Sequence, residues 1–227
     1  MNPDLPFRPA KHARHKLLTS ILDGTHGPGS ALPAERILAG ELGVTRPTLR
    51  ETLHGLQKEG WITIQHGKST MVNDYWTTGG LTLLSTMTDY AAYLPKEFIS
   101  HLLSVRVVLL PAIADLAIKR APQTILDHLS TLEQLKDTPP DYAAYDWGLQ
   151  ALMARNSGNP FYALLLNDFG SIYHSMAQGY FTRKSGRQRS LRFYRDLRSV
   201  ISKRGTGVER LVQTAMQDSL DLWRRKK

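Results

Sequence analysis

The stretch LPAERILAGELGVTRPTLRETLHGLQKEGWITIQHGK, residues 32–68, changes its hydrophobic period near its end. Up to Gly60 the apolar residues recur every three or four positions, which predicts helices, and WITIQ then alternates like a strand. Gly43 suits the left-handed position that ends a helix. Thr45 can cap the next helix, and Pro47 fits its first turn, where an amide hydrogen would have no partner. The stretch therefore predicts two helices joined by a short turn, followed by a strand.

The flanking residues extend this pattern on both sides. KHARHKLLTSILDG, residues 11–24, predicts a helix that Gly24 ends, and STMVN, residues 69–73, predicts a second strand. The turn His66-Gly67-Lys68 would join the two strands as a hairpin. Three helices and a hairpin in this order indicate a winged helix-turn-helix domain over residues 1–74, followed by a short linker over residues 75–80.

The rest of the chain, residues 81–227, has helical spacing throughout. The breaks fall at Pro122, Pro139–Pro140, Gly158 and Gly186, and no pair of strands is predicted. The expected fold is therefore mostly α: an N-terminal winged helix-turn-helix with a small β-hairpin, followed by an all-α helical bundle that binds a ligand.

Composition and charge limit the classes of function. The chain has 227 residues, a formal net charge of +9 and no cysteine, which excludes disulfides, thiolate metal sites and a cysteine nucleophile. Residues 183–227 carry 14 Lys/Arg against 4 Asp/Glu, so the basic character lies far from residues 32–68 and hints at two anionic partners. No signal peptide and no apolar run of about 20 residues is expected, which predicts a cytoplasmic protein with no membrane partner.

The start of the predicted helix after Gly43 exposes Thr45, Arg46, Thr48 and Arg50. The major groove of DNA admits an α-helix, arginine reads guanine edges there, and the amides of a helix N-terminus favour a phosphate. The hairpin turn at residues 66–68, which forms the wing, is a second candidate for contact with DNA. The alternative is a solvated helix face beside Glu51, but the surrounding elements favour contact with double-stranded DNA.

Residues 32–68 resemble the DNA-binding domain of GntR-type bacterial repressors, through Leu-Pro-x-Glu-Arg, Gly-Val-Ser/Thr-Arg and the glycine-bearing wing. LLSVR, NSGNPFY and GYF further resemble the branch of that family that controls fatty acid metabolism, so the resemblance covers almost the whole chain. It implies a homodimer that binds a palindromic operator and is released when long-chain acyl-CoA binds the helical domain. The resemblance is compatible with a repressor that also activates genes.

The resemblance assigns residues to both sites. The implied DNA contacts are Arg36, Thr45, Arg46, Thr48 and Arg50, with His66, Gly67 and Lys68 in the wing. Aromatic and leucine positions of the bundle are candidates for an acyl-chain tunnel or for ordinary core, and the candidate ligand-binding residues are Leu102, Leu103, Arg106, Tyr173, Tyr180, Tyr194, Ser219 and Trp223. Three positions depart from the family pattern: Pro47, Gln150 and Ala215. They leave one phosphate contact and the chain-length preference in doubt.

Charged residues of the bundle refine the ligand prediction. Arg106 stands alone in the apolar run LLSVRVVLL and needs an anionic or hydrogen-bonding partner if it is buried. The cations of residues 224–227 could meet the phosphates of CoA or could form a solvated face. Many relatives hold a metal through an Asp followed by a Phe-His pair, but Leu149-Gln150 follow Asp146 here. No metal and no cofactor besides the effector is therefore predicted.

The sequence leaves three alternative functions to compare with this prediction. The same architecture could sense a different acyl thioester or a carboxylic acid. An enzyme acting on acyl-CoA is disfavoured, because the sequence has no Gly-x-Ser-x-Gly elbow and no placed Ser/His/Asp set. A non-specific DNA-packaging protein would bind without a specificity ratio of about 10³ or more. The prediction is a transcription factor and not an enzyme.

Overall fold

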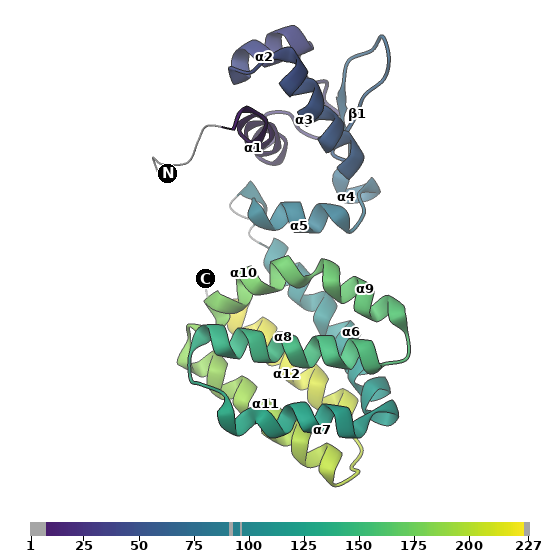
Figure 1. Ribbon diagram of the computed structural model, residues 1–227, viewed down its shortest axis with the longest axis vertical. Helices are drawn as coiled ribbons and strands as arrows, with labels where there is room; N and C mark the ends of the chain where they lie inside the picture. The colour runs from purple at the N-terminus through teal and green to yellow at the C-terminus, as the bar shows by residue number, and fades with distance from the viewer. Residues whose placement is uncertain (1–7, 91–92, 96, 225–227) are drawn as a thin grey trace. The chain divides into compact units, whose positions relative to one another are not determined.

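The computed structural model describes residues 8–90, 93–95 and 97–224. The chain divides into two compact units, Met1–Pro95 and Lys96–Lys227 (Figure 1). The first unit contains α1 (Pro9–Leu22), α2 (Glu35–Leu42), α3 (Arg46–Glu59), β1 (Ile62–Thr63), β2 (Met71–Val72), α4 (Tyr75–Thr78) and α5 (Thr82–Asp89). This order confirms the predicted winged helix-turn-helix. Within the predicted linker, residues 75–78 form α4, and Tyr75 is buried against Trp61.

The turn between α2 and α3 forms for the local reasons that the sequence indicates. Gly43 has a φ of +64°, which a residue with a side chain adopts only with strain, and the amide of Val44 donates to the Ala39 carbonyl. Thr45 caps α3 by accepting a hydrogen bond from the Thr48 amide at 3.4 Å. These contacts fix where α3 begins and leave its first turn exposed.

The core of the first unit lies between α1 and the inner side of α3. Leu17, Leu18 and Ile21 of α1 are fully buried, as are the leucines of α3. Trp61, which is also fully buried, donates its indole N–H to Glu59, and Arg14 of α1 forms an ion pair with the same carboxylate at 2.8 Å. The hairpin is shorter than predicted, because only Ile62–Val72 and Thr63–Met71 pair, with Ala31 bridging Met71 on the outer edge.

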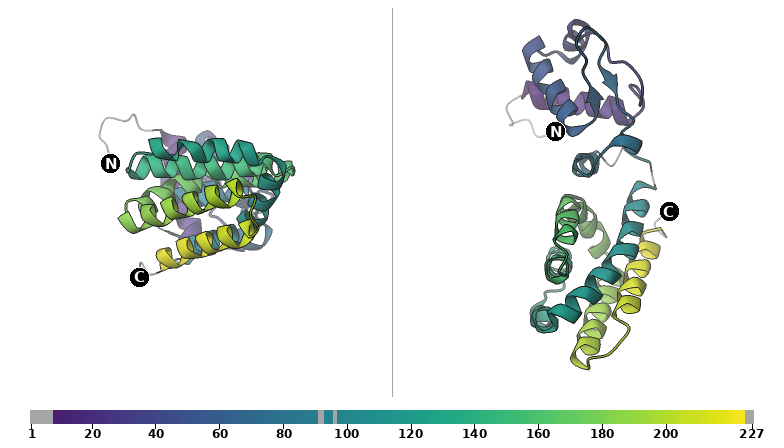
Figure 2. Two further views of the ribbon diagram at one scale, coloured as in Figure 1. Left: turned by 90° about the horizontal axis from the view of Figure 1, so that it is seen from below. Right: turned by 90° about the vertical axis from the view of Figure 1, so that its right-hand side faces the viewer.

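The second unit is all-helical over its described residues, as predicted. Its elements are α6 (Phe98–Arg120), α7 (Pro122–Ser130), η2 (Thr131–Gln134), α8 (Pro139–Asn156), α9 (Pro160–Asp168), α10 (Gly170–Phe181), α11 (Lys184–Ser202) and α12 (Val208–Arg224). Helix α12 runs along α6, which also packs on α8, while α11 packs on α12 and α7 (Figure 2). One continuous apolar core joins these helices.

Helix α6 overturns one expectation from the sequence. With 23 residues and a mean hydropathy of 1.8 over its most apolar window, it is long and apolar enough to cross a membrane. Length and composition alone are weak grounds for a span, because a helix at the centre of a soluble bundle passes the same test. In this unit α6 packs against both α8 and α12, but only 33% of its most apolar window is buried and Val108 is 74% exposed. This packing therefore accounts for only part of its apolar sequence.

Candidate DNA-binding face and ligand cavity

The side chains predicted to contact DNA lie on α2, on the start of α3 and on the hairpin turn of the first unit. Arg36, Arg46 and Arg50 are exposed, as is the whole wing tip, and Thr48 is half-buried. The wing closes through a hydrogen bond from the Lys68 amide to the Gln65 carbonyl at 3.2 Å, with Gly67 at a φ of +71°. Pro47 occupies the first turn of α3 and is exposed.

A carboxylate from α2 organises the two arginines of α3. Glu35 accepts a hydrogen bond from Arg50 Nε at 2.7 Å, and Arg46 Nη2 lies 3.8 Å from the same oxygen. The sequence interpretation placed these arginines beside Glu51 and missed Glu35, although that residue is part of the motif Leu-Pro-x-Glu-Arg. Exposed ion pairs of this kind contribute at most about 1 kcal/mol, so the arginines can leave Glu35 for a DNA partner at little cost.

The second unit contains a partly open cavity of about 310 Å³ between α6, α8, α9, α10, α11 and α12. Of the predicted ligand-binding residues, those that line it are Leu102, Leu103, Arg106, Tyr173, Tyr180, Ser219 and Trp223. Tyr194 does not line the cavity; it is fully buried in the core, and its hydroxyl donates to Asp146. Gln150 and Ala215, two of the departures from the family pattern, are also lining residues. Of the C-terminal cations, Arg224 is exposed at the end of α12, and residues 225–227 lie outside the described part of the chain.

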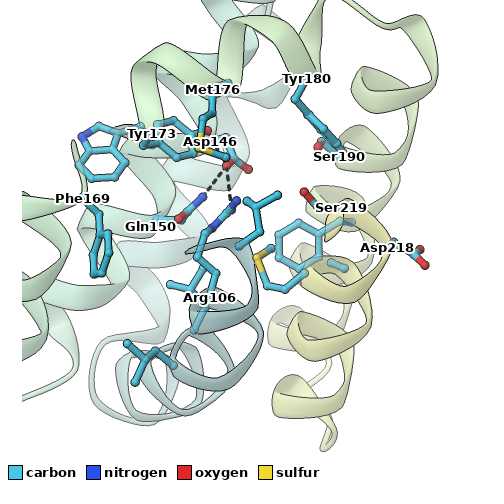
Figure 3. A pocket seen from close by; sticks show the side chains of 18 of the residues that line it. Arg106, Asp146, Gln150, Phe169, Tyr173, Met176, Tyr180, Ser190, Asp218 and Ser219 are labelled. Carbon is cyan, nitrogen blue, oxygen red and sulfur yellow. Dashed lines mark hydrogen bonds and ion pairs between the residues drawn. The ribbon is translucent and has the colours of Figure 1, made fainter. Parts of the chain in front are cut away.

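Asp146 of α8 is the centre of a buried polar cluster at the wall of this cavity (Figure 3). Its side chain accepts hydrogen bonds from the hydroxyls of Tyr173 and Tyr194, each at 2.7 Å, and from the Gln150 amide. Arg106 Nη2 lies 3.8 Å from Asp146 Oδ2, and the guanidinium lies 5.6 Å from the centre of the Tyr173 ring. Arg106 therefore has the anionic partner that its place in an apolar run requires.

Sequence reasoning treated Asp146 only as a lost metal ligand and did not connect it with Arg106. The five residues of the cluster come from four helices, α6, α8, α10 and α11, so no local spacing reveals that they meet. No group of three His, Asp or Glu side chains that could hold a metal occurs within residues 8–90, 93–95 and 97–224. The described cluster is instead a carboxylate satisfied by tyrosines, an amide and an arginine.

The tyrosines of the cluster keep their protons well into the alkaline range. Burial raises the pKa of Tyr173 and of Tyr194 well above the usual value, and the negative charge of Asp146 raises both pKa values further. Burial also raises the pKa of Tyr145, whose ring lies tilted beside that of Tyr194, to about 12. The hydroxyls of Tyr173 and Tyr194 therefore act as hydrogen-bond donors to Asp146 at neutral pH.

The raised pKa values predict that the helical unit loses stability in alkali. A raised folded-state pKa stabilises the protein fully below the unfolded tyrosine pKa of about 10, and this contribution falls as the pH rises above that value. Tyr173 and Tyr194 should each remove about 1.4 kcal/mol per pH unit there. Urea denaturation at a series of pH values measures the slope, to which Tyr142, Tyr145 and Tyr180 also contribute because their pKa values are raised as well. Tyr194→Phe should make the slope shallower by about 1.4 kcal/mol per pH unit. A stability independent of pH between about 9 and 11 would contradict this account.

Comparison with known proteins shows which families the two parts of the chain match. Residues 9–72 match the family described as bacterial regulatory proteins, gntR family, and residues 73–227 match the FadR C-terminal domain. The fatty acid metabolism regulator protein of Shewanella pealeana is 39% identical over 216 residues, covering 95% of this chain and 90% of its own. The protein of the same name from Shewanella baltica strain OS155 is also 39% identical, covering 95% and 91%.

Solved structures support the fold alone. The structure of Lar, which controls the expression of the Listeria monocytogenes agr system, covers 97% of this chain and 96% of its own with a TM-score of 0.54 and 16% identity.

A winged helix-turn-helix in one unit and a helical effector fold in the other define a DNA-binding transcription regulator, not an enzyme. The chain belongs to the GntR family and carries its FadR type of C-terminal domain, which makes it a regulator of fatty acid metabolism.

Proposed function

We propose that the protein is a cytoplasmic homodimeric repressor that binds a palindromic operator and is released from it by long-chain acyl-CoA. The observation that carries this proposal is the partly open cavity in the effector unit, whose wall is formed largely by leucine and aromatic side chains. Burying an acyl tail there would stabilise the complex by about 25 cal/mol per Å² of apolar surface removed from water. A membrane is not a proposed partner.

Two arginines of α11 support an anionic head group, in a lining that also contains Asp146, Asp196 and Asp218. Arg189 and Arg192 of α11 are lining residues, and neither forms an ion pair within the described part of the chain. Ser219 and Trp223 of α12 contribute to the same wall, and Arg224 follows them. An acyl-CoA has both an apolar chain and phosphates, so it matches this combination better than a free fatty acid does.

The proposed DNA complex uses α3 in the major groove, with Arg36 on α2 beside it, and the wing residues His66, Gly67 and Lys68 at the minor groove. A symmetric dimer presents two such helices to half-sites separated by about one helical turn or a multiple of it, which explains a palindromic operator. A ligand that binds better to the form with misaligned helices shifts the population away from DNA.

Titration with acyl-CoA tests this proposal. We expect long-chain acyl-CoA to weaken operator binding by roughly 5–150-fold, because allosteric coupling between two sites is typically about 1–3 kcal/mol. A mobility-shift or fluorescence-anisotropy assay at fixed salt measures the change. Coenzyme A without a tail is the control and should leave operator affinity unchanged. Operator affinity that is insensitive to long-chain acyl-CoA would contradict the proposal.

A second candidate effector is a more polar acyl thioester or a carboxylic acid. The specific observation in its favour is that Arg106, Asp146 and Gln150 line the cavity. A plain hydrocarbon chain cannot form hydrogen bonds or ion pairs with these side chains. Including short-chain acyl-CoAs and free carboxylic acids in the same titration separates these ligands from long-chain acyl-CoA.

A further inference from the structure

Two buried polar atoms at the cavity have no hydrogen-bond partner among the described residues. They are Nε of Arg106, which is a donor, and Oε1 of Gln150, which is an acceptor. Gln150 is only 3% exposed, and both residues line the cavity, from α6 and α8 respectively. A buried polar atom without a partner costs about 1–3 kcal/mol, so pairing it with a ligand would gain affinity. Both atoms have almost no exposed surface, so a ligand reaches them once the ends of the Arg106 and Gln150 side chains turn toward the cavity.

The orientation of the Gln150 amide follows from its neighbour. Asp146 Oδ2 accepts hydrogen bonds and donates none, so the amide must turn its NH₂ group toward the carboxylate. The carbonyl oxygen of Gln150 is consequently the atom left without a donor. Gln150→Glu would therefore place a second carboxylate beside that of Asp146.

The two unpartnered atoms belong to the same part of the cavity wall. Gln150 Nε2 and Arg106 Nη2 both meet Asp146 Oδ2, the latter at 3.8 Å. Each unpartnered atom is two covalent bonds away from the nitrogen that meets this oxygen. Figure 3 shows the Arg106 guanidinium and the Gln150 amide both directed toward Asp146.

A hydroxyl group is the simplest complement to one donor and one acceptor. Its oxygen can accept from Arg106 Nε while its hydrogen is donated to Gln150 Oε1. A ketone would satisfy only the arginine, and a methylene group would satisfy neither. We propose that the preferred effector is an acyl thioester that carries a hydroxyl on its chain, recognised by Arg106 and Gln150. This inference rests on the proposed function and specifies its ligand.

The test compares ligands that differ only in the hydroxyl. Isothermal titration calorimetry of the full chain would use octadecanoyl-CoA and its hydroxylated forms, with the hydroxyl at the third carbon, at mid-chain or near the end. At least one hydroxylated form should bind about tenfold more tightly than octadecanoyl-CoA, because one or two buried hydrogen bonds are gained. The position of the preferred hydroxyl would give the depth of Arg106 along the bound chain.

Variants of Gln150 assign the preference to this residue. Gln150→Leu, or Gln150→Met if the first does not fold, removes the acceptor and should bring the ratio of the two affinities close to one. Gln178→Leu, at an exposed position of α10 outside the cavity lining, should keep the wild-type ratio. Circular dichroism confirms that each variant is folded.

The outcomes separate this inference from the proposed function. Tight binding of octadecanoyl-CoA with no gain for any hydroxylated form would overturn the inference alone, as would a ratio that survives in the Gln150 variants. In that case a water molecule or direct contact between Arg106 and Gln150 satisfies both atoms. Absence of binding by every acyl-CoA would instead overturn the proposed function.

Discussion

Replacing Asp146 with alanine is expected to lower the free energy of unfolding of the helical unit by about 3–5 kcal/mol. Asp146 is 6% exposed, and its carboxylate is the partner of Arg106 and the hydrogen-bond acceptor of Tyr173 and Tyr194. The variant leaves a largely buried guanidinium without a counter-charge and two buried phenols without acceptors. Breaking a buried ion pair by removing one partner is costly for that reason.

Urea denaturation followed by circular dichroism measures this loss, since most of the helix lies in the second unit. Asp146→Asn retains an acceptor and the side-chain volume, so it should cost less than alanine. Tyr194→Phe removes one hydrogen bond and should cost about 1 kcal/mol. Asp168→Ala, at an exposed position near the end of α9, is the matched control and should change stability by no more than about 0.5 kcal/mol. A loss below about 1 kcal/mol for Asp146→Ala would show that water or another group replaces the carboxylate.

The DNA-binding unit could be predicted in detail because its signals are local. The glycine after α2, the threonine cap of α3 and the leucine stripe each act within a few residues of chain, and the structure forms all three as expected. The strand lengths were overestimated, because alternation in WITIQ and STMVN does not show how many residues pair. Only Ile62–Thr63 and Met71–Val72 do so.

Sequence patterns do not reveal contacts between segments that lie far apart in the chain. Glu35 lies fifteen residues before Arg50 on a different helix, so their 2.7 Å contact depends on the angle between α2 and α3. The cluster around Asp146 depends in the same way on how four helices pack. The cavity is the space that remains between the helices after they pack. The spacing of apolar residues identifies the buried face of each helix, but it does not show where two buried faces leave a gap between them.

Replacing Arg46 with alanine is expected to weaken operator binding by about 1–3 kcal/mol, or roughly 5–150-fold, and to relax the base preference at one position of each half-site. Arg46 is exposed in the first turn of α3, and within the described part of the chain its guanidinium has only a distant contact, to Glu35 at 3.8 Å. It is therefore free to make the two parallel hydrogen bonds by which arginine recognises guanine. Competition binding to operators with single base changes measures both effects.

Lys68→Ala is the matched comparison, because it also removes one exposed cation from the same unit. A lysine at the wing tip that contacts a phosphate should lower affinity for operator and random DNA by the same factor and reduce the salt slope by about 1. Arg46→Ala should instead lower the ratio between operator and random DNA. Equal losses on both DNAs would assign Arg46 to the phosphate backbone and leave base reading to Arg36 or Arg50. Since Arg50 Nε is held by Glu35 at 2.7 Å, Glu35→Gln would then show whether that ion pair orients the reading arginine.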